Sequence, residues 1–251
     1  MKLKTLVAMI GLSLSASAFA VPLVANSSTP SVINAAPGGE SSLQTIADGL
    51  YSPAGSIDVV NGQSSAGMFA STSPSAATTI PTLVAEFTGN SSTQIFGIWF
   101  GTDTSNIVNY DLMLGSAGVG AAAAISIGNG TLDVGSVPVI GCGTTINCGS
   151  FSNALINPNS FGFYFQASAN SPRYYSLDQL NPNGQDRVVA FQNGASTNWL
   201  FAYEDGTDFD YNDMAVKVES ITAAVPEPET YALMLAGLAA MGFVARRRKA
   251  S

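Results

Sequence analysis

Residues 198–204 read NWLFAYE, and every second side chain in this stretch is aromatic. Trp199, Phe201 and Tyr203 would therefore share one face of an extended chain, because successive side chains of a β-strand point to opposite sides. The same alternation occurs in residues 160–167, SFGFYFQA, and in residues 214–219, MAVKVE. These three stretches predict half-buried antiparallel strands.

Three further apolar runs resemble these strands in length and composition. They are TLVAEF at 82–87, IFGIWF at 95–100 and RVVAF at 187–191, and turn pairs such as Asn183-Gly184 and Asn193-Gly194 separate the segments. No stretch keeps an apolar period of 3.6 residues with helix caps for about ten residues. The sequence therefore predicts an all-β domain over residues 40–222, an antiparallel β-sandwich that is jelly-roll-like.

Two segments rich in Ser, Thr, Ala and Pro lack this alternation. Residues 26–39 belong to an expected linker over 21–39, and residues 64–82 are expected to form a long surface loop, because neither segment has the periodicity to bury much area. The Gly- and Ala-rich stretch 115–130 fits either a tight strand pair or a mobile loop, and both remain open at this point.

Charge is distributed unevenly along the 251 residues. Fifteen of the 17 acidic residues but only three of the nine basic ones, Arg173, Arg187 and Lys217, lie between residues 21 and 225. Three scattered cations cannot neutralise a phosphate backbone, so DNA and RNA are excluded as partners. The chain also contains no His, which removes Ser-His-Asp and Cys-His nucleophile activation and the commonest zinc ligand.

Residues 1–20, MKLKTLVAMIGLSLSASAFA, have the layout of a secretory signal peptide. Two lysines precede an apolar stretch from Leu6 to Leu14, and the small residues Ala18 and Ala20 form a cleavage pattern. An uncleaved membrane anchor is the alternative, but the apolar stretch is short. We therefore expect export, with signal peptidase cutting after Ala20.

The C-terminal region, expected to be a separate unit over residues 223–251, has three consecutive parts. The first is Val225-Pro226-Glu227-Pro228, where two prolines keep the chain extended and accessible to a processing enzyme. Residues 231–245 carry no charge and predict a short transmembrane helix, and four basic residues at 246–249 are expected to stay cytoplasmic. A buried core helix is the alternative for 231–245, but core helices rarely end in four cations.

This tripartite tail resembles the PEP-CTERM sorting signal of Gram-negative bacteria that make exopolysaccharide. The resemblance implies that an exosortase, a membrane transpeptidase, recognises the tail at Val225, Pro226, Glu227 and Pro228 and removes it. The protein would cross the inner membrane, stay anchored there transiently, and then reach the cell surface or the extracellular medium.

The two cysteines, Cys142 and Cys148, lie in the stretch GCGTTINCG. Export would place them in an oxidising compartment, so we expect a local disulfide that closes a hairpin. A redox or metal-binding pair is the less favoured alternative, because the spacing is not Cys-x-x-Cys and the chain has no further thiol or imidazole.

The densest group of acidic residues lies in the stretch 204–213, EDGTDFDYND. Carboxylates this close repel one another unless solvent, a proton or a cation compensates their charge. Oxygen ligands at alternate positions suit Ca²⁺, which accepts about six to eight oxygens. We therefore expect a calcium site in the loop before the last long strand, formed by Asp205, Asp208, Asp210, Asn212 and Asp213.

Two other interpretations of this stretch remain. A solvated acidic loop would use Asp and Asn side chains for turn hydrogen bonds and hold no ion. An EF-hand would use Asp208, Asp210, Asn212 and Glu219 at its first, third, fifth and twelfth positions. However, Asp213 stands where that loop requires Gly, and the flanking residues alternate as strands do.

The second half of the body resembles a bacterial family of domains of unknown function that end in Asp-x-Asp-Phe/Tyr-Asn-Asp. The matching segments are Phe161-Gly162-Phe163-Tyr164, Tyr175-Ser176, Leu180-Asn181-Pro182-Asn183-Gly184, Glu204-Asp205 and Asp208-Phe209-Asp210-Tyr211-Asn212-Asp213. Such domains occur in exported and calcium-associated surface proteins, so the resemblance supports a calcium site. Asp186-Arg187 stands where family members often have Asp-His, and any role of that His is absent here.

Together these features predict a non-enzymatic protein of the cell surface or extracellular matrix, with a structural or adhesive role among exopolysaccharide in a biofilm. Tyr174, Tyr175 or Tyr211 would stack on sugars if exposed, or pack in the fold if buried. The alternative is a secreted glycoside hydrolase, because a pair of carboxylates suffices for that chemistry and needs no His.

Overall fold

The structure is a computed structural model, and it describes residues 21–24, 26, 33–36, 38–72, 80–86, 91–136, 142, 143, 145–224, 238 and 241. The expected signal peptide and processing residues 225–228 lie outside these ranges, as does all of the segment 231–245 except Leu238 and Met241. Within the described part of the chain, no helix is both long and apolar enough to cross a membrane.

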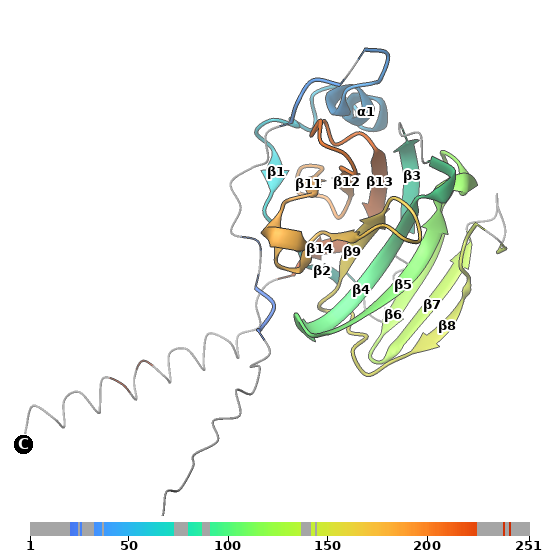
Figure 1. Ribbon diagram of the computed structural model, residues 1–251, viewed down its shortest axis with the longest axis vertical. Helices are drawn as coiled ribbons and strands as arrows, with labels where there is room; N and C mark the ends of the chain where they lie inside the picture. Colours follow the sequence, from blue (N-terminus) through green and yellow to red (C-terminus); the bar gives the residue numbers. More distant parts are fainter. Residues whose placement is uncertain are drawn as a thin grey trace, which may run out of the picture.

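The described residues fold mainly into antiparallel strands with little helix, which confirms the all-β prediction (Figure 1). The largest sheet has the order β1 (Gln63–Ser64), β11 (Val188–Gln192), β12 (Trp199–Tyr203), β13 (Met214–Glu219) and β3 (Ile80–Glu86). A second sheet has the order β10 (Arg173–Tyr175), β9 (Gly162–Gln166), β4 (Ile95–Asp103) and β5 (Asn106–Leu114). A third contains β6 (Ala123–Gly128), β7 (Thr131–Ser136) and β8 (Gly149–Ser152), and β14 (Ile221–Ala223) pairs with β2 (Phe69–Ser71).

The two larger sheets face each other across an aromatic core. The rings of Phe201 on β12 and Phe163 on β9 lie 5.2 Å apart between centroids, and those of Tyr203 and Phe165 lie 5.5 Å apart. These four side chains come from the alternating positions predicted to be buried, and pairs of this kind stabilise a core beyond the area they bury. The strands predicted at 160–167, 198–204 and 214–219 are confirmed.

Helix α1 (Leu43–Leu50) covers the other face of the largest sheet (Figure 1). Its apolar residues Leu43 and Ala47, with Tyr51 after it, pack in one cluster with Leu200 and Ala202 of β12. The side chain of Ser42 caps the helix by accepting a hydrogen bond from the backbone N–H of Thr45 at 3.3 Å. Both faces of β12 are therefore buried. The apolar pattern of the sequence did not predict α1, because this helix has only eight residues.

The expectation of a surface loop over 64–82 is wrong at its two ends, where Ser64 lies in β1 and residues 80–82 lie in β3, and it is also wrong for residues 69–71. They form β2, and Phe69 is fully buried with its ring 5.1 Å from that of Trp199 and 5.0 Å from that of Phe201. A single aromatic residue among Ser and Ala gives no periodicity, so only the core around it reveals its role. In the stretch 115–130, the strand alternative is observed, because β6 pairs with β7.

The short helices of the 3-10 type connect these strands, and a disulfide closes one loop. They are η1 (Ser91–Thr93), η2 (Gly115–Ala117), η3 (Asp178–Leu180) and η4 (Pro182–Gly184). Cys142 and Cys148 are joined with a Cα–Cα distance of 5.5 Å, which confirms the predicted disulfide. The bridge lies in the connection from β7 to β8, far along the chain from the acidic loop.

Candidate metal centre

The acidic loop, residues 204–213, connects β12 to β13. Glu204 follows the last residue of β12 and is fully buried, and Asp210 is 1% exposed. One carboxylate oxygen from each of Glu204, Asp208 and Asp210 lies within 4.8 Å of the others. Asp208 is exposed, so the group of three reaches from the interior to the surface.

The backbone of the loop is unusual on both sides of Asp210. Phe209 has a φ of 56° and Tyr211 a φ of 55°, a left-handed conformation that bulky residues seldom adopt. Tyr211 is buried in the cluster beneath α1, with Phe209 packed against that cluster. Asp210 lies between these two aromatic residues, and its carboxylate is buried. Backbone strain of this kind is concentrated at functional sites in proteins.

Backbone N–H groups satisfy only part of the buried carboxylates. Glu204 accepts hydrogen bonds from the N–H of Gly206 at 2.6 Å and from the N–H of Tyr211 at 3.4 Å. Asp210 Oδ1 accepts from the N–H of Asn212 at 3.2 Å. Its Oδ2 is buried and has no hydrogen-bond partner among the described residues. An unpartnered buried oxygen is costly, so this atom is a candidate ligand for a cation.

The pKa values of the buried carboxylates are also shifted. Burial raises the pKa of Glu204 and of Asp210, and the nearby charge of Asp208 raises both further. Among the described residues, no basic side chain forms an ion pair with any of these three carboxylates. The charge of the two buried carboxylates is therefore unfavourable unless a proton or a cation compensates it.

Asp205 and Asp213 form a second acidic pair beside the group of three. The backbone N–H of Asp205 donates to Asp213 Oδ2 at 2.6 Å. Burial, together with the charges of Asp205, Glu204 and Asp208, raises the pKa of Asp213 to about 8. Burial also raises the pKa of Asp205, whereas hydrogen bonds and the charge of Arg187 act in the opposite direction.

The structure thus divides the five residues predicted to bind calcium. It brings Asp208 and Asp210 together and places Asp205 and Asp213 in the neighbouring pair. The amide nitrogen of Asn212 donates to Glu40 Oε2 at 3.3 Å and to the carbonyl of Ser41 at 3.2 Å.

The prediction omitted Glu204, which completes the group of three. Its position at the end of an alternating strand was the available signal. Strands β12 and β13 flank the acidic loop, and Glu219 is paired with Lys217 at 2.6 Å on β13, so the EF-hand alternative does not describe this loop.

Arg187 is the basic residue that approaches the acidic loop. Its Nη1 donates to the carbonyl of Gly206 at 2.6 Å, and its guanidinium lies 4.9 Å from the ring centre of Phe209 and 5.3 Å from that of Tyr174. This stacking holds the turn of the loop in place. Tyr174 is half-buried and stacked against this guanidinium, and Tyr175 and Tyr211 are buried, so packing within the fold accounts for these rings.

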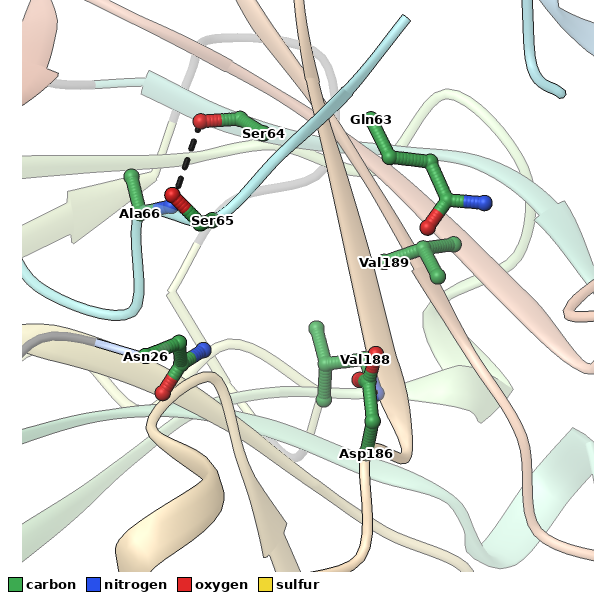
Figure 2. Close-up of a pocket in the computed structure, with 8 residues that line it drawn as sticks. All are labelled: Asn26, Gln63, Ser64, Ser65, Ala66, Asp186, Val188 and Val189. Carbon is green, nitrogen blue, oxygen red and sulfur yellow. Dashed lines mark hydrogen bonds between the residues drawn. The ribbon is translucent and has the colours of Figure 1, made fainter. Parts of the chain in front are cut away.

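A separate polar cavity of about 150 Å³ is lined in part by Asp186 and Val188, the chain neighbours of Arg187 (Figure 2). Its lining residues are Asn26, Gln63, Ser64, Ser65, Ala66, Asp186, Val188 and Val189. The chemistry of the lining is one carboxylate with amide and hydroxyl groups. A single carboxylate is too few for a metal centre of the oxygen-ligand type, so the acidic loop is the stronger candidate.

The fold and the loop define a β-rich protein with a buried acidic centre, and comparison with known proteins adds two matches. Residues 224–249 match the PEP-CTERM protein-sorting motif, and residues 149–221 match the domain of unknown function DUF4114. The second match runs from β8 to the start of β14 and includes the whole acidic loop. No curated protein and no solved structure shows a significant match. The sorting motif implies an exported protein that is transiently anchored in a membrane and processed by an exosortase.

Proposed function

We propose that this exosortase substrate is a non-enzymatic protein of the cell surface or extracellular matrix, built on a calcium-stabilised β-sandwich. The sorting motif at 224–249 supports export and processing. The facing sheets support a sandwich, with jelly-roll connectivity as the expected arrangement. One Ca²⁺ would be held by Glu204, Asp208 and Asp210, and the body would have a structural or adhesive role among exopolysaccharide in a biofilm.

The buried Oδ2 of Asp210 carries the calcium proposal. Its carboxylate belongs to the group of three with Glu204 and Asp208, and this oxygen has no hydrogen-bond partner among the described residues. Hard oxygen ligands favour Ca²⁺, which would take its remaining ligands from backbone carbonyls or water. Zinc is a poor fit, because the chain has no His and both cysteines are in the disulfide.

The same geometry argues against a glycoside hydrolase. That chemistry requires two carboxylates on opposite sides of a glycosidic bond, one acting as an acid and the other as a base or nucleophile. Glu204 is fully buried and Asp210 is 1% exposed, so neither can reach a sugar in this conformation. A screen for hydrolysis of the native exopolysaccharide checks this, and turnover that disappears in Glu204→Gln would refute the non-enzymatic proposal.

Calorimetric titration of the purified full-length protein with Ca²⁺ tests the metal site. We expect one site filled at or below millimolar calcium, and at least tenfold weaker binding in Asp210→Asn. Asp133→Asn is the matched control, because it removes an exposed carboxylate from β7 and should leave the affinity unchanged. If the native protein binds no calcium at millimolar concentration, the calcium proposal is wrong.

The final location is tested by mass spectrometry of the protein recovered from the cell envelope and from the medium. We expect a mature chain without residues 1–20 and without the segment after the Pro-Glu-Pro sequence. Recovery of the intact chain from the cytoplasm would contradict the proposal.

A further inference from the structure

The segment before and within α1 contacts the acidic loop directly. The backbone N–H of Asn34 donates to the carbonyl of Phe209 at 2.8 Å, and its side-chain amide donates to the carbonyl of Asp208. On the other side of Asp210, the amide of Asn212 donates to Glu40 Oε2 at 3.3 Å. Residues far apart in the sequence thus hold the loop on both sides of its buried carboxylate.

The same segment is attached to the sheet by apolar packing next to the loop. Leu43, Ala47 and Tyr51 lie in the cluster that contains Tyr211. Tyr211 belongs to the acidic loop and follows Asp210 directly. The position of the loop backbone and the docking of α1 therefore depend on each other.

Glu40 adds a charge to this interface. Its Oε2 accepts from the side-chain amide of Asn212, which is two residues along the chain from Asp210. When the site holds no cation, Glu40 and the three carboxylates repel one another. When a divalent cation is bound, the repulsion is replaced by attraction, and docking of the segment is favoured.

We infer that binding of the cation at Glu204, Asp208 and Asp210 is coupled to docking of the helix segment, residues 33–36 and 38–51, with Glu40 and Asn34 as positioning residues. This inference rests on the proposed calcium site. Binding of the cation stabilises the packing of α1 against the largest sheet. Because coupling between two events is reciprocal, the docked segment in turn raises the affinity for the cation.

Hydrogen exchange of the full-length protein, measured in calcium and in EDTA, tests the first half of this coupling. We expect the amides of α1 to exchange at least about tenfold more slowly with calcium. The amides of β6 and β7 serve as the internal reference and should not change. Equal exchange of α1 in both buffers, while calcium binding is observed by calorimetry, would overturn the inference and leave the metal site itself intact.

The affinity for calcium in Asn34→Ala tests the reverse direction. Asn34 offers no ligand to the group of three, so a structural coupling is needed for its loss to matter. We expect affinity to fall about three- to tenfold, the range for one hydrogen bond. Asn61→Ala, which removes an exposed amide bonded to Asp58 in the following turn, is the matched control and should bind as the native protein does. Unchanged affinity in Asn34→Ala would contradict the coupling.

Glu40→Gln separates charge from position. Glutamine retains an oxygen that accepts from Asn212, but it removes the charge beside Asp210. In EDTA we expect the amides of α1 in this variant to exchange more slowly than in the native protein, and the difference between EDTA and calcium to narrow. Exchange identical to that of the native protein would show that repulsion from Glu40 plays no part. Absence of calcium binding in the native protein would instead refute the proposed function.

Discussion

The carboxylates of Glu204 and Asp210 lie within 4.8 Å of each other in the interior of the protein, although five residues separate them in the chain. Both belong to the loop between β12 and β13, and Phe209, which directly precedes Asp210, has the left-handed φ of 56°. Two buried carboxylates at this separation are stable only if the charge between them is compensated.

Replacement of Asp210 by Asn should have opposite effects with and without calcium. In EDTA, the variant lacks a buried charge that is repelled by its neighbours. We therefore expect its free energy of unfolding to rise by roughly 1 kcal/mol, and its melting temperature to rise with it. With calcium at about 100 times the dissociation constant, the native protein should gain about 2.7 kcal/mol, and the variant should gain much less.

Thermal unfolding followed by circular dichroism in the two buffers measures this reversal. Asp133→Asn, in the exposed part of β7, should follow the native protein in both. A variant Asp210→Asn that is less stable than the native protein in EDTA would contradict the view that the empty site is electrostatically strained.

Stability without calcium should depend on the protonation of Asp178. Burial, with the nearby charge of Asp186, raises the pKa of Asp178 to about 7, and its Oδ1 is buried with no hydrogen-bond partner among the described residues. The unfolded chain releases this proton near pH 4 and the folded chain near pH 7, so the folded state binds more protons between these values. Stability should therefore fall as the pH rises from about 4 to 7.

Melting temperatures of the native protein and of Asp178→Asn in EDTA, at pH 5 and pH 8, measure this contribution. From pH 5 to pH 8, the free energy of unfolding of the variant should fall by about 1 kcal/mol less than that of the native protein. The effect is this small because the Asp178 side chain is partly exposed to solvent. Equal losses would show that Asp178 does not titrate in this range.

Gly97 should tolerate no side chain. It lies opposite Tyr164 on β9 and Asp111 on β5, and a Cβ atom there would overlap the Tyr164 ring, whose hydroxyl donates to Asp111. Gly97→Ala should lower the free energy of unfolding, measured in denaturant, by about 2 kcal/mol or more.

Gly49→Ala is the matched control, because a Cβ on this residue of α1 meets no atom within 4 Å. This variant should raise the free energy of unfolding by about 0.5 to 1 kcal/mol. Equal effects would refute the packing argument.

Removal of the disulfide by Cys142→Ala and Cys148→Ala together should destabilise the protein by about 2 kcal/mol, the loop-closure entropy expected for a short ring. Cys148 packs against the core cluster between the two larger sheets, whereas Tyr211 of the acidic loop belongs to the separate cluster with α1. Calcium affinity should therefore stay unchanged. Urea unfolding and calcium titration of the double variant measure the two effects. A loss of calcium binding in a folded double variant would show that the bridge also shapes the metal centre.

Some elements of the fold follow from local sequence patterns, and others depend on contacts between distant segments. The alternation of Trp199, Phe201 and Tyr203 predicts β12 because the side-chain period of a strand is a local property. Phe69 gives no such signal, and its position in the core depends on strands more than a hundred residues later. Helix α1 was missed for a related reason, since eight residues bury their apolar face only because the sheet is there to receive it.

The amino-acid sequence by itself determined the class of fold, the pairing of the two cysteines, the sorting tail and the concentration of carboxylates in residues 204–213, because each depends on residue type and spacing along the chain. Only the tertiary structure decided which of these carboxylates share a site. It placed Glu204 with Asp208 and Asp210, joined Asp205 to Asp213, and brought Glu40 beside them. The physical reason is that the contacts among these groups depend on how β12, β13 and α1 pack, which spacing along the chain does not specify.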